Sequence, residues 1–184
     1  IYDAVATSIF AMWSAELAPA VFEDDFRAFG FGAPGDQFTT KALLHLLEDS
    51  GRSDDGFRVH TLDVERGEST MWDDVTTGEV ETRDTVLLTA LATALQRLET
   101  RFGTDDMLAW RWGEIHQVRF EHFFGLAAGL RLFDLGPFPA PGARLTVNPA
   151  GYSLRQRNDF IFSGGPSQRF VAVLDPAGVR AVNS

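Results

Sequence analysis

The stretch Trp110-Arg-Trp-Gly-Glu-Ile-His-Gln-Val-Arg-Phe-Glu-His122 marks the point where the chain changes from a helical to an extended pattern. Before it, apolar residues recur at steps of three and four, as they do along one face of a helix. From Glu114 to Phe120 they alternate, with His116 and Val118 on the same face as Phe120, which predicts a buried strand. Helices first and strands later indicate an α+β fold with an antiparallel sheet.

The residues before this stretch predict two well-marked helices. Apolar side chains share one face from Ile1 to Ala18, and Pro19 is expected to end that helix or to open the next turn. Thr82 opens the longest helix, with Asp84 in its first turn and Gly103 where a left-handed cap belongs. The expected apolar stripe of this second helix is Leu87, Leu91, Leu95 or Ala94, Leu98 and Phe102.

The segments between these helices are less regular. Val21 to Phe31 predicts a short helix followed by a loop, because Gly30 and Gly32 interrupt it. Thr39 or Thr40 can cap a further helix that runs to about Asp49. Residues 52–81 are expected to be irregular.

The residues after the central stretch predict mainly strands. Phe123 to Phe133 fits either a short helix or a packed loop, and the prolines between Pro137 and Gly142 indicate a long turn. Three further strands are expected at Leu145–Val147, Asp159–Phe162 and Gln168–Leu174. The predicted organisation is therefore a mainly helical part over 1–109 and a mainly β part over 110–184. The chain opens within a helix at Ile1 and stops just after a strand-like run, so we expect a single fragment of a larger protein.

Composition limits the partners that the chain can have. The 184 residues carry a formal net charge of −10, which disfavours binding to nucleic acid, because such binding rests on phosphate neutralisation. Sixteen phenylalanines and four tryptophans supply a large apolar core. Cysteine is lacking, which excludes disulfides and thiolate chemistry. No stretch has the roughly 20 consecutive apolar residues of a membrane span.

The residues capable of chemistry do not form a complete active site in the sequence. His116 and His122 are six apart, without the spacing of a zinc site, and a hydrogen-bonded core or edge histidine is the better interpretation. His45 and His60 have no obvious partner. Ser167 lies in a turn and lacks the Gly-x-Ser-x-Gly pattern of a nucleophilic serine. Most of the four acid pairs are interpreted as caps and solvated turns, with Asp73-Asp74 organising a turn before the long helix; the others are Asp24-Asp25, Asp54-Asp55 and Asp105-Asp106.

Several separated runs resemble the penicillin amidase family, in the order in which that family shows them. Met71–Asp84 resembles its segment before a long helix, and Leu87–Phe102 resembles that helix. The central stretch resembles a strand with the pattern Trp-x-Trp-Gly-x-x-His-x-x-x-Phe-x-His. The remaining similar runs are Leu135–Pro139, Thr146–Asn148 and Gly165–Val171 with Asp175. The resemblance covers about residue 71 to the end.

This resemblance implies a late β-chain segment of an acylase that cleaves the amide bond of an N-acylated small molecule, such as a β-lactam or an acyl-homoserine lactone. Family members are N-terminal-nucleophile hydrolases with an αββα sandwich, in which a serine freed by self-cleavage attacks the amide. Ile1 cannot be that serine, and Asn148 does not match the oxyanion run. No catalytic, cofactor-binding or metal-binding residue is therefore assigned here.

The resemblance also implies partners and a location. The partners would be the α-chain and the N-terminal part of the β-chain of the same precursor, together with the acyl amide substrate. It implies no cofactor in this segment, with calcium allowed elsewhere in the full-length protein, and a periplasmic or secreted location. The segment alone is expected to be inactive.

Trp110, Trp112, Phe120, Phe160 and Phe170 would be core residues. The alternative function is a non-catalytic structural or binding domain with the same architecture.

Overall fold

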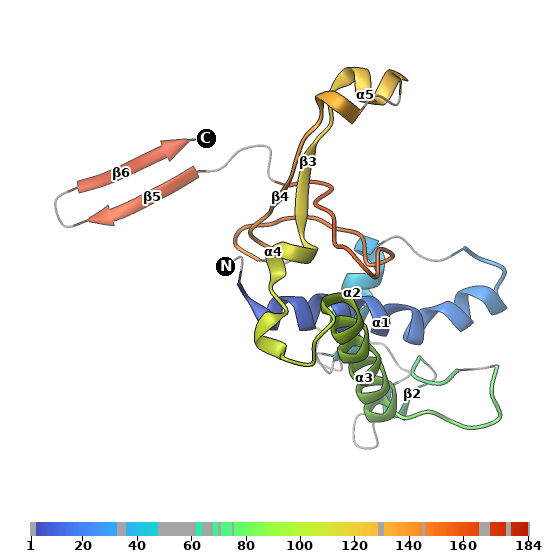
Figure 1. Cartoon of the computed structure of the whole chain (residues 1–184). Coiled ribbons are helices and arrows are strands. Elements are labelled where there is room, and N and C mark those ends of the chain that lie inside the picture. The colour runs from blue at the N-terminus through green and yellow to red at the C-terminus, as the bar shows by residue number, and fades with distance from the viewer. Residues whose placement is uncertain are drawn as a thin grey trace.

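A computed structural model describes most of the chain, and the account below is restricted to that part. The described residues are 3–32, 36–47, 62–63, 68–69, 71–74, 76–128, 131–144, 146–165, 170–175 and 178–183. Within them, three long helices precede most of the strands (Figure 1). The predicted α+β class is confirmed: helices dominate the N-terminal half and antiparallel strands the C-terminal half.

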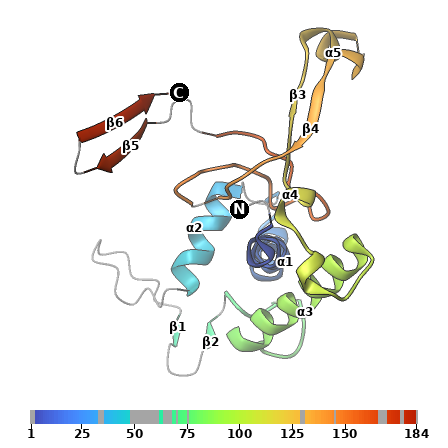
Figure 2. The same cartoon turned by 60° about the vertical axis from the view of Figure 1, so that its left-hand side comes forward.

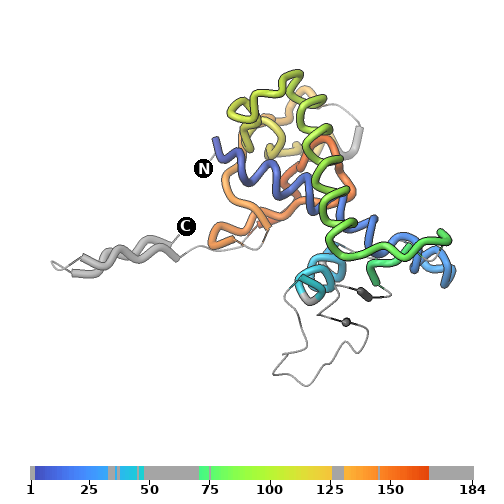
Figure 3. The backbone as a smooth tube through the Cα atoms, turned by 90° about the horizontal axis from the view of Figure 1, so that it is seen from below, coloured from blue at the N-terminus to red at the C-terminus, as the bar shows by residue number. Residues whose placement is uncertain are grey.

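Two long helices form the centre of the fold. Helix α1 (Val5–Ala28) crosses α3 (Arg83–Phe102), as Figure 3 shows from below. Small residues line the contact, with Ala11 and Ala15 of α1 and Ala90 and Ala94 of α3 fully or almost fully buried. Such residues let two helix backbones approach closely. Helix α2 (Asp36–Leu47) packs against another side of α1 (Figure 2) and contributes buried Leu43 and Leu46.

The predicted end of the first helix at Pro19 is wrong. Helix α1 continues through Pro19 to Ala28, so it also includes most of the segment predicted as a short helix and loop. Proline removes one helical hydrogen bond and crowds the preceding turn. Beyond it, however, Val21 and Phe22 are buried in the same core as Leu17. Burial of this extended apolar face offsets the local cost of the proline.

Helix α2 begins three residues before the first of the two predicted caps. It starts at Asp36, so Thr39 and Thr40 lie inside the helix, and the Thr40 hydroxyl donates to the Asp36 carbonyl at 2.7 Å. The predicted end near Asp49 lies outside the described residues.

The caps of α3 are confirmed. The Thr82 side chain accepts from the Thr85 amide, and Gly103 closes the helix in the left-handed conformation with φ 67°. Its buried stripe lies one position before the predicted one for most of its length: Val86, Ala90, Ala94 and Leu98 are buried, whereas Leu87 and Leu91 are only partly covered. The helix is also shorter than α1, with 20 residues against 24.

The central stretch is a helical turn followed by a short strand. Helix α4 (Trp112–Ile115) precedes β3 (Gln117–Phe120), so the predicted strand from Glu114 starts three residues too early. Strand β3 pairs antiparallel with β4 (Leu135–Pro139), where a long turn was predicted. Helix α5 (Phe123–Ala128) and a 3-10 turn (Arg131–Phe133) connect them.

The segment Asp159–Phe162, which was predicted to be a strand, forms no regular strand but donates two backbone hydrogen bonds to residues around the start of β3. The Phe160 amide donates to the Ile115 carbonyl at 2.6 Å, and the Phe162 amide donates to the Gln117 carbonyl at 2.9 Å. On the other side, the Ala140 amide donates to the His116 carbonyl at 2.9 Å. Residues 115–117 are thus held between two extended segments by backbone hydrogen bonds on both sides.

The remaining strands form separate hairpins. Strand β5 (Phe170–Asp175) pairs with β6 (Gly178–Asn183), and β1 (Leu62–Asp63) pairs with β2 (Glu68–Ser69). Among the described residues, β3 and β5 therefore do not share a sheet. The strand predicted at 145–147 is absent at its described residues 146 and 147, which lie in bends.

Helix α1 is also long and apolar enough to cross a membrane by length and composition. Half of its most apolar window is buried inside this structure, where it packs against α2, α3 and α4. These contacts make α1 the core helix of the described fold.

Candidate functional site

Four rings form a buried aromatic cluster at the base of β3. Trp112 stacks on His116 with ring centroids 4.6 Å apart, and Tyr152 meets both rings edge-on. Phe160 completes the cluster, 5.7 Å from Trp112 and 5.0 Å from Tyr152. The Trp112 indole also donates to the Gly142 carbonyl at 2.7 Å. Of the predicted core residues, Trp112 and Phe160 are confirmed here, and Trp110 is buried nearby.

His116 is positioned as a structural residue. Its ring is fully buried, and Nδ1 lies 2.5 Å from the Phe160 carbonyl, so Nδ1 carries the proton and donates. Nε2 is buried without a hydrogen-bond partner among the described residues. A base in serine catalysis must reach a hydroxyl. The His116 side chain instead bonds to backbone, which confirms the interpretation of His116 as a hydrogen-bonded core histidine.

Burial lowers the pKa of His116 below its ordinary value, although the hydrogen bond to Phe160 opposes part of that shift. The unfolded chain therefore binds this proton more readily than the folded chain. The contribution of neutral His116 to the free energy of unfolding is complete above the ordinary histidine pKa of about 6.5. This contribution is lost as pH falls below that value. We expect the free energy of unfolding, measured with urea, to decrease between pH 7.5 and pH 5.5.

The control for this pH dependence is His116→Asn. Its amide nitrogen can take the place of Nδ1 and donate to the Phe160 carbonyl, but it does not titrate in this range. The variant should show a smaller loss of stability on acidification than the unmodified chain. An identical loss in both proteins would show that other groups cause the effect.

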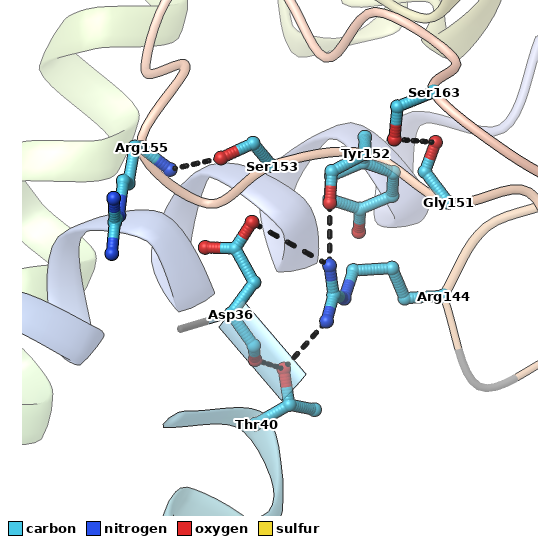
Figure 4. Close-up of polar contacts among 8 residues, drawn as sticks. All are labelled: Asp36, Thr40, Arg144, Gly151, Tyr152, Ser153, Arg155 and Ser163. Atoms are coloured by element: carbon cyan, nitrogen blue, oxygen red, sulfur yellow. Dashed lines mark hydrogen bonds and ion pairs between the residues drawn. The ribbon is translucent and has the colours of Figure 1, made fainter. Parts of the chain in front are cut away.

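Arg144 joins α2 to the loop that carries Tyr152. Figure 4 shows its guanidinium between Asp36 and Thr40 on one side and the Tyr152 carbonyl on the other. It lies 3.2 Å from the Thr40 hydroxyl and 4.0 Å from the Asp36 carboxylate. Burial raises the pKa of Tyr152 to about 12, and the Arg144 charge acts against that rise. Arg144 therefore has the contacts of a structural residue.

Glu16 makes a second polar junction inside the fold. Its carboxylate is almost fully buried on α1, 2.8 Å from Arg97 of α3 and 3.8 Å from Arg157 of the C-terminal loop. A carboxylate buried in this way needs its partners, because removing them would leave an uncompensated charge. Glu16 thus holds three separate segments together.

Two clefts lie where α1 meets α2 and the C-terminal loop. One of about 210 Å³ is lined by apolar residues that include Phe22 and by the charged residues Asp36, Arg155 and Arg157. The other is a narrow apolar crevice between α1, α2 and the Tyr152 loop, with Trp13 and Leu43 in its walls. Neither cleft is lined by a histidine.

The interpretation of the acid pairs as caps and turns is wrong for Asp24-Asp25, which lies inside α1 and is partly buried, but holds for Asp106, which caps a 3-10 turn by accepting from the Leu108 amide. Asp74 accepts from the Thr76 amide and hydroxyl, and these hydrogen bonds lower the pKa of Asp74. Glu81 accepts from the Asp74 amide at 2.9 Å. The predicted role of Asp73-Asp74 in a turn before α3 is therefore confirmed for Asp74. Burial and the charges of Asp24 and Asp73 raise the pKa of Asp25.

The other candidate residues do not converge. His122 lies exposed beyond β3, and its Nδ1 accepts from the Phe124 amide. His60, Ser167 and the side chains of His45 and Phe170 lie outside the described part of the chain. Within the described residues, no group of three or more histidine, aspartate or glutamate side chains could hold a metal ion. Phe120, predicted as core, is 59% exposed in this chain.

Comparison with known proteins gives the chain a family. The family model of penicillin amidase matches residues 2–184. The acyl-homoserine lactone acylase QuiP of Pseudomonas fluorescens (strain Pf0-1) is 31% identical over 106 residues, which are 58% of this chain and 12% of that protein. The acylase of the same name from Pseudomonas aeruginosa is 30% identical over 107 residues, again 12% of its length.

The chain thus spans only about 12% of the curated relatives that it matches. No solved structure matches it. Because the family match extends over nearly the whole chain, the protein belongs to the penicillin amidase family.

Proposed function

We propose that this chain is a late β-chain segment of an acylase that hydrolyses the amide bond of an N-acylated small molecule. The family match over residues 2–184 carries the proposal. The names of the relatives favour N-acyl homoserine lactones as the substrate class. The described residues add a consistent observation, since His116 bonds to backbone and no residue described here pairs with it as a nucleophile.

In the proposed reaction, the catalytic serine lies outside this chain, at the start of the β-chain. Its hydroxyl oxygen attacks the amide carbonyl carbon, and its proton passes through the serine's own α-amino group to the leaving nitrogen. The carbon–nitrogen bond breaks and leaves an ester on the serine. Water then hydrolyses that ester and releases the acid. Such an enzyme would be periplasmic or secreted, as the family resemblance implies.

The contribution of this chain would be architectural. The Trp112 cluster, the Arg144 junction and the Glu16 junction fix α1, α2, α3 and the C-terminal loop relative to one another. We propose that its strands complete the αββα sandwich of the full-length protein. Any calcium would bind outside this segment.

The test compares the complete polypeptide that carries this chain with the chain alone. Both are incubated with N-acyl homoserine lactones, and the released primary amine is measured. Amide cleavage releases that amine, whereas opening of the lactone ring does not. We expect release by the complete protein and none by the chain alone.

The matched control replaces the first serine of the β-chain in the complete protein with alanine, which should abolish amine release. Turnover by the chain alone that survives repurification would contradict the proposal. Amine release that persists in the serine variant would contradict it as well.

A further inference from the structure

The β3–β4 hairpin and its connection form an arm that projects from the helices. The arm comprises residues 117–139, with β3 and β4 as its shaft and α5 and the 3-10 turn as its tip. Figures 1 and 2 both show the shaft leading away from α1 and α3, with α5 at the far end. At its base, the arm is anchored through the hydrogen bonds from Ala140 and Phe160 to residues 116 and 115.

The arm exposes large apolar side chains along its whole length. Seven of them lie within residues 120–138, and each is about half exposed or more: Phe120, Phe123, Phe124, Leu132, Phe133, Leu135 and Phe138. Leu132 is 86% exposed. Single exposed apolar residues are ordinary on protein surfaces, but a contiguous group of this size marks an interaction site.

These side chains form an arranged surface. Phe120 of β3 pairs with Leu135, and its ring lies diagonally beside Phe138 of β4 with ring centroids 6.4 Å apart. At the tip, the His122 ring lies 5.4 Å from Phe124 and 5.5 Å from Phe133, and these two phenylalanine rings are 6.3 Å apart. The His122 amide also donates to the Asp134 carboxylate at 2.9 Å, which ties the two sides of the tip together. Contacts within the arm therefore already position these apolar side chains when no partner is bound.

Both faces of the shaft are uncovered. Successive residues of a strand point to opposite faces. All five residues of β4 are exposed, as are Arg119 and Phe120 in β3. A two-stranded ribbon of this kind is marginal in water by itself. A second copy of this chain that packed against the shaft around a twofold axis would cover one face of the two strands and leave the other face exposed to solvent.

We propose that the arm inserts into the remaining polypeptide of the same acylase, which encloses it on both faces. The proposal rests on the proposed function, because it takes the chain as part of a longer acylase. We choose the remaining polypeptide as the partner that covers the arm because this chain spans only 12% of the length of its relatives. Most of such a polypeptide therefore lies outside this chain. The arm is then the element that seats this segment in the complete enzyme.

The experiment places a photoactivatable phenylalanine analogue in the complete polypeptide, at Phe124 of the tip in one variant and at Leu88 of α3 in another. Both positions are exposed in this structure, at 55% and 66%, but only Phe124 belongs to the arm. After irradiation, mass spectrometry maps the products. We expect Phe124 to cross-link to residues of the same polypeptide outside this chain, several-fold more efficiently than Leu88.

A second measurement uses Phe124→Glu and Leu88→Glu in the complete polypeptide, with the yield of soluble protein as the readout. Phe124→Glu should reduce that yield several-fold and Leu88→Glu should not. Cross-links from Phe124 to a second copy or to lipid would overturn the proposal, as would equal yields of both variants. Neither readout depends on amide hydrolysis, so an inactive protein with the expected cross-links would contradict the proposed function and leave the arm's role supported.

Discussion

Replacing Trp112 with alanine is expected to lower the free energy of unfolding of this chain by about 3 to 5 kcal/mol. The ring is 1% exposed and touches every other member of the aromatic cluster, so its loss leaves a large cavity. The substitution also leaves the buried Gly142 carbonyl without its indole donor. Urea unfolding at pH 7.5, followed by circular dichroism, measures the change.

Two further variants separate packing from hydrogen bonding. Trp112→Phe keeps an aromatic ring in the cluster but loses the indole donor, so we expect a loss of only about 1 to 2 kcal/mol. Leu88→Ala removes an apolar side chain that is 66% exposed and should change stability little. If Trp112→Ala cost no more than Leu88→Ala, the cluster would not be the core of this half of the chain.

The elements predicted best were those with local signals at both ends. Helix α3 runs from Arg83 to Phe102 because the capping hydroxyl of Thr82 and the left-handed Gly103 act directly at its ends. The turn around Asp74 is likewise local, since its carboxylate accepts from Thr76, two residues away. Short-range chemistry of this kind can be read directly from a sequence.

The errors came from contacts between distant segments. Pro19 was expected to end α1, but Val21 and Phe22 beyond it join the core and keep the helix intact. The prolines of β4 were interpreted as a turn, whereas pairing with β3 makes the segment extended. Neither outcome is encoded within the segment itself, because each depends on a partner far away in the sequence.

The candidate site shows the same division. An aromatic core around the central stretch was predictable, because large rings are buried wherever a fold has room for them. The hydrogen bond that assigns a structural role to His116 joins it to a carbonyl 44 residues away, and no spacing rule indicates it. The exposure of Phe120 was missed because an alternating apolar pattern predicts burial without naming the surface that provides it.

Replacing Gly142 with alanine is expected to destabilise the chain by about 3 kcal/mol or more, as the sum of two costs. Gly142 has a φ of +90°, a conformation that residues with a Cβ rarely adopt. A Cβ added there would lie 2.2 Å from the Asn148 carbonyl oxygen, so the backbone itself must move. That movement displaces the carbonyl that accepts from Trp112, and the damage reaches the aromatic cluster.

Gly103→Ala is the matched control, because it separates backbone strain from the steric clash. Gly103 also has a positive φ, of +67°, but nothing lies within 4 Å of an added Cβ. Its substitution should cost only about 1 kcal/mol by urea unfolding. Equal losses at both glycines would show that the contact with Asn148 yields easily. Because Gly142 bonds directly to Trp112, Gly142→Ala should cost less in a Trp112→Phe background than in the unmodified chain, since part of what it disrupts is already lost.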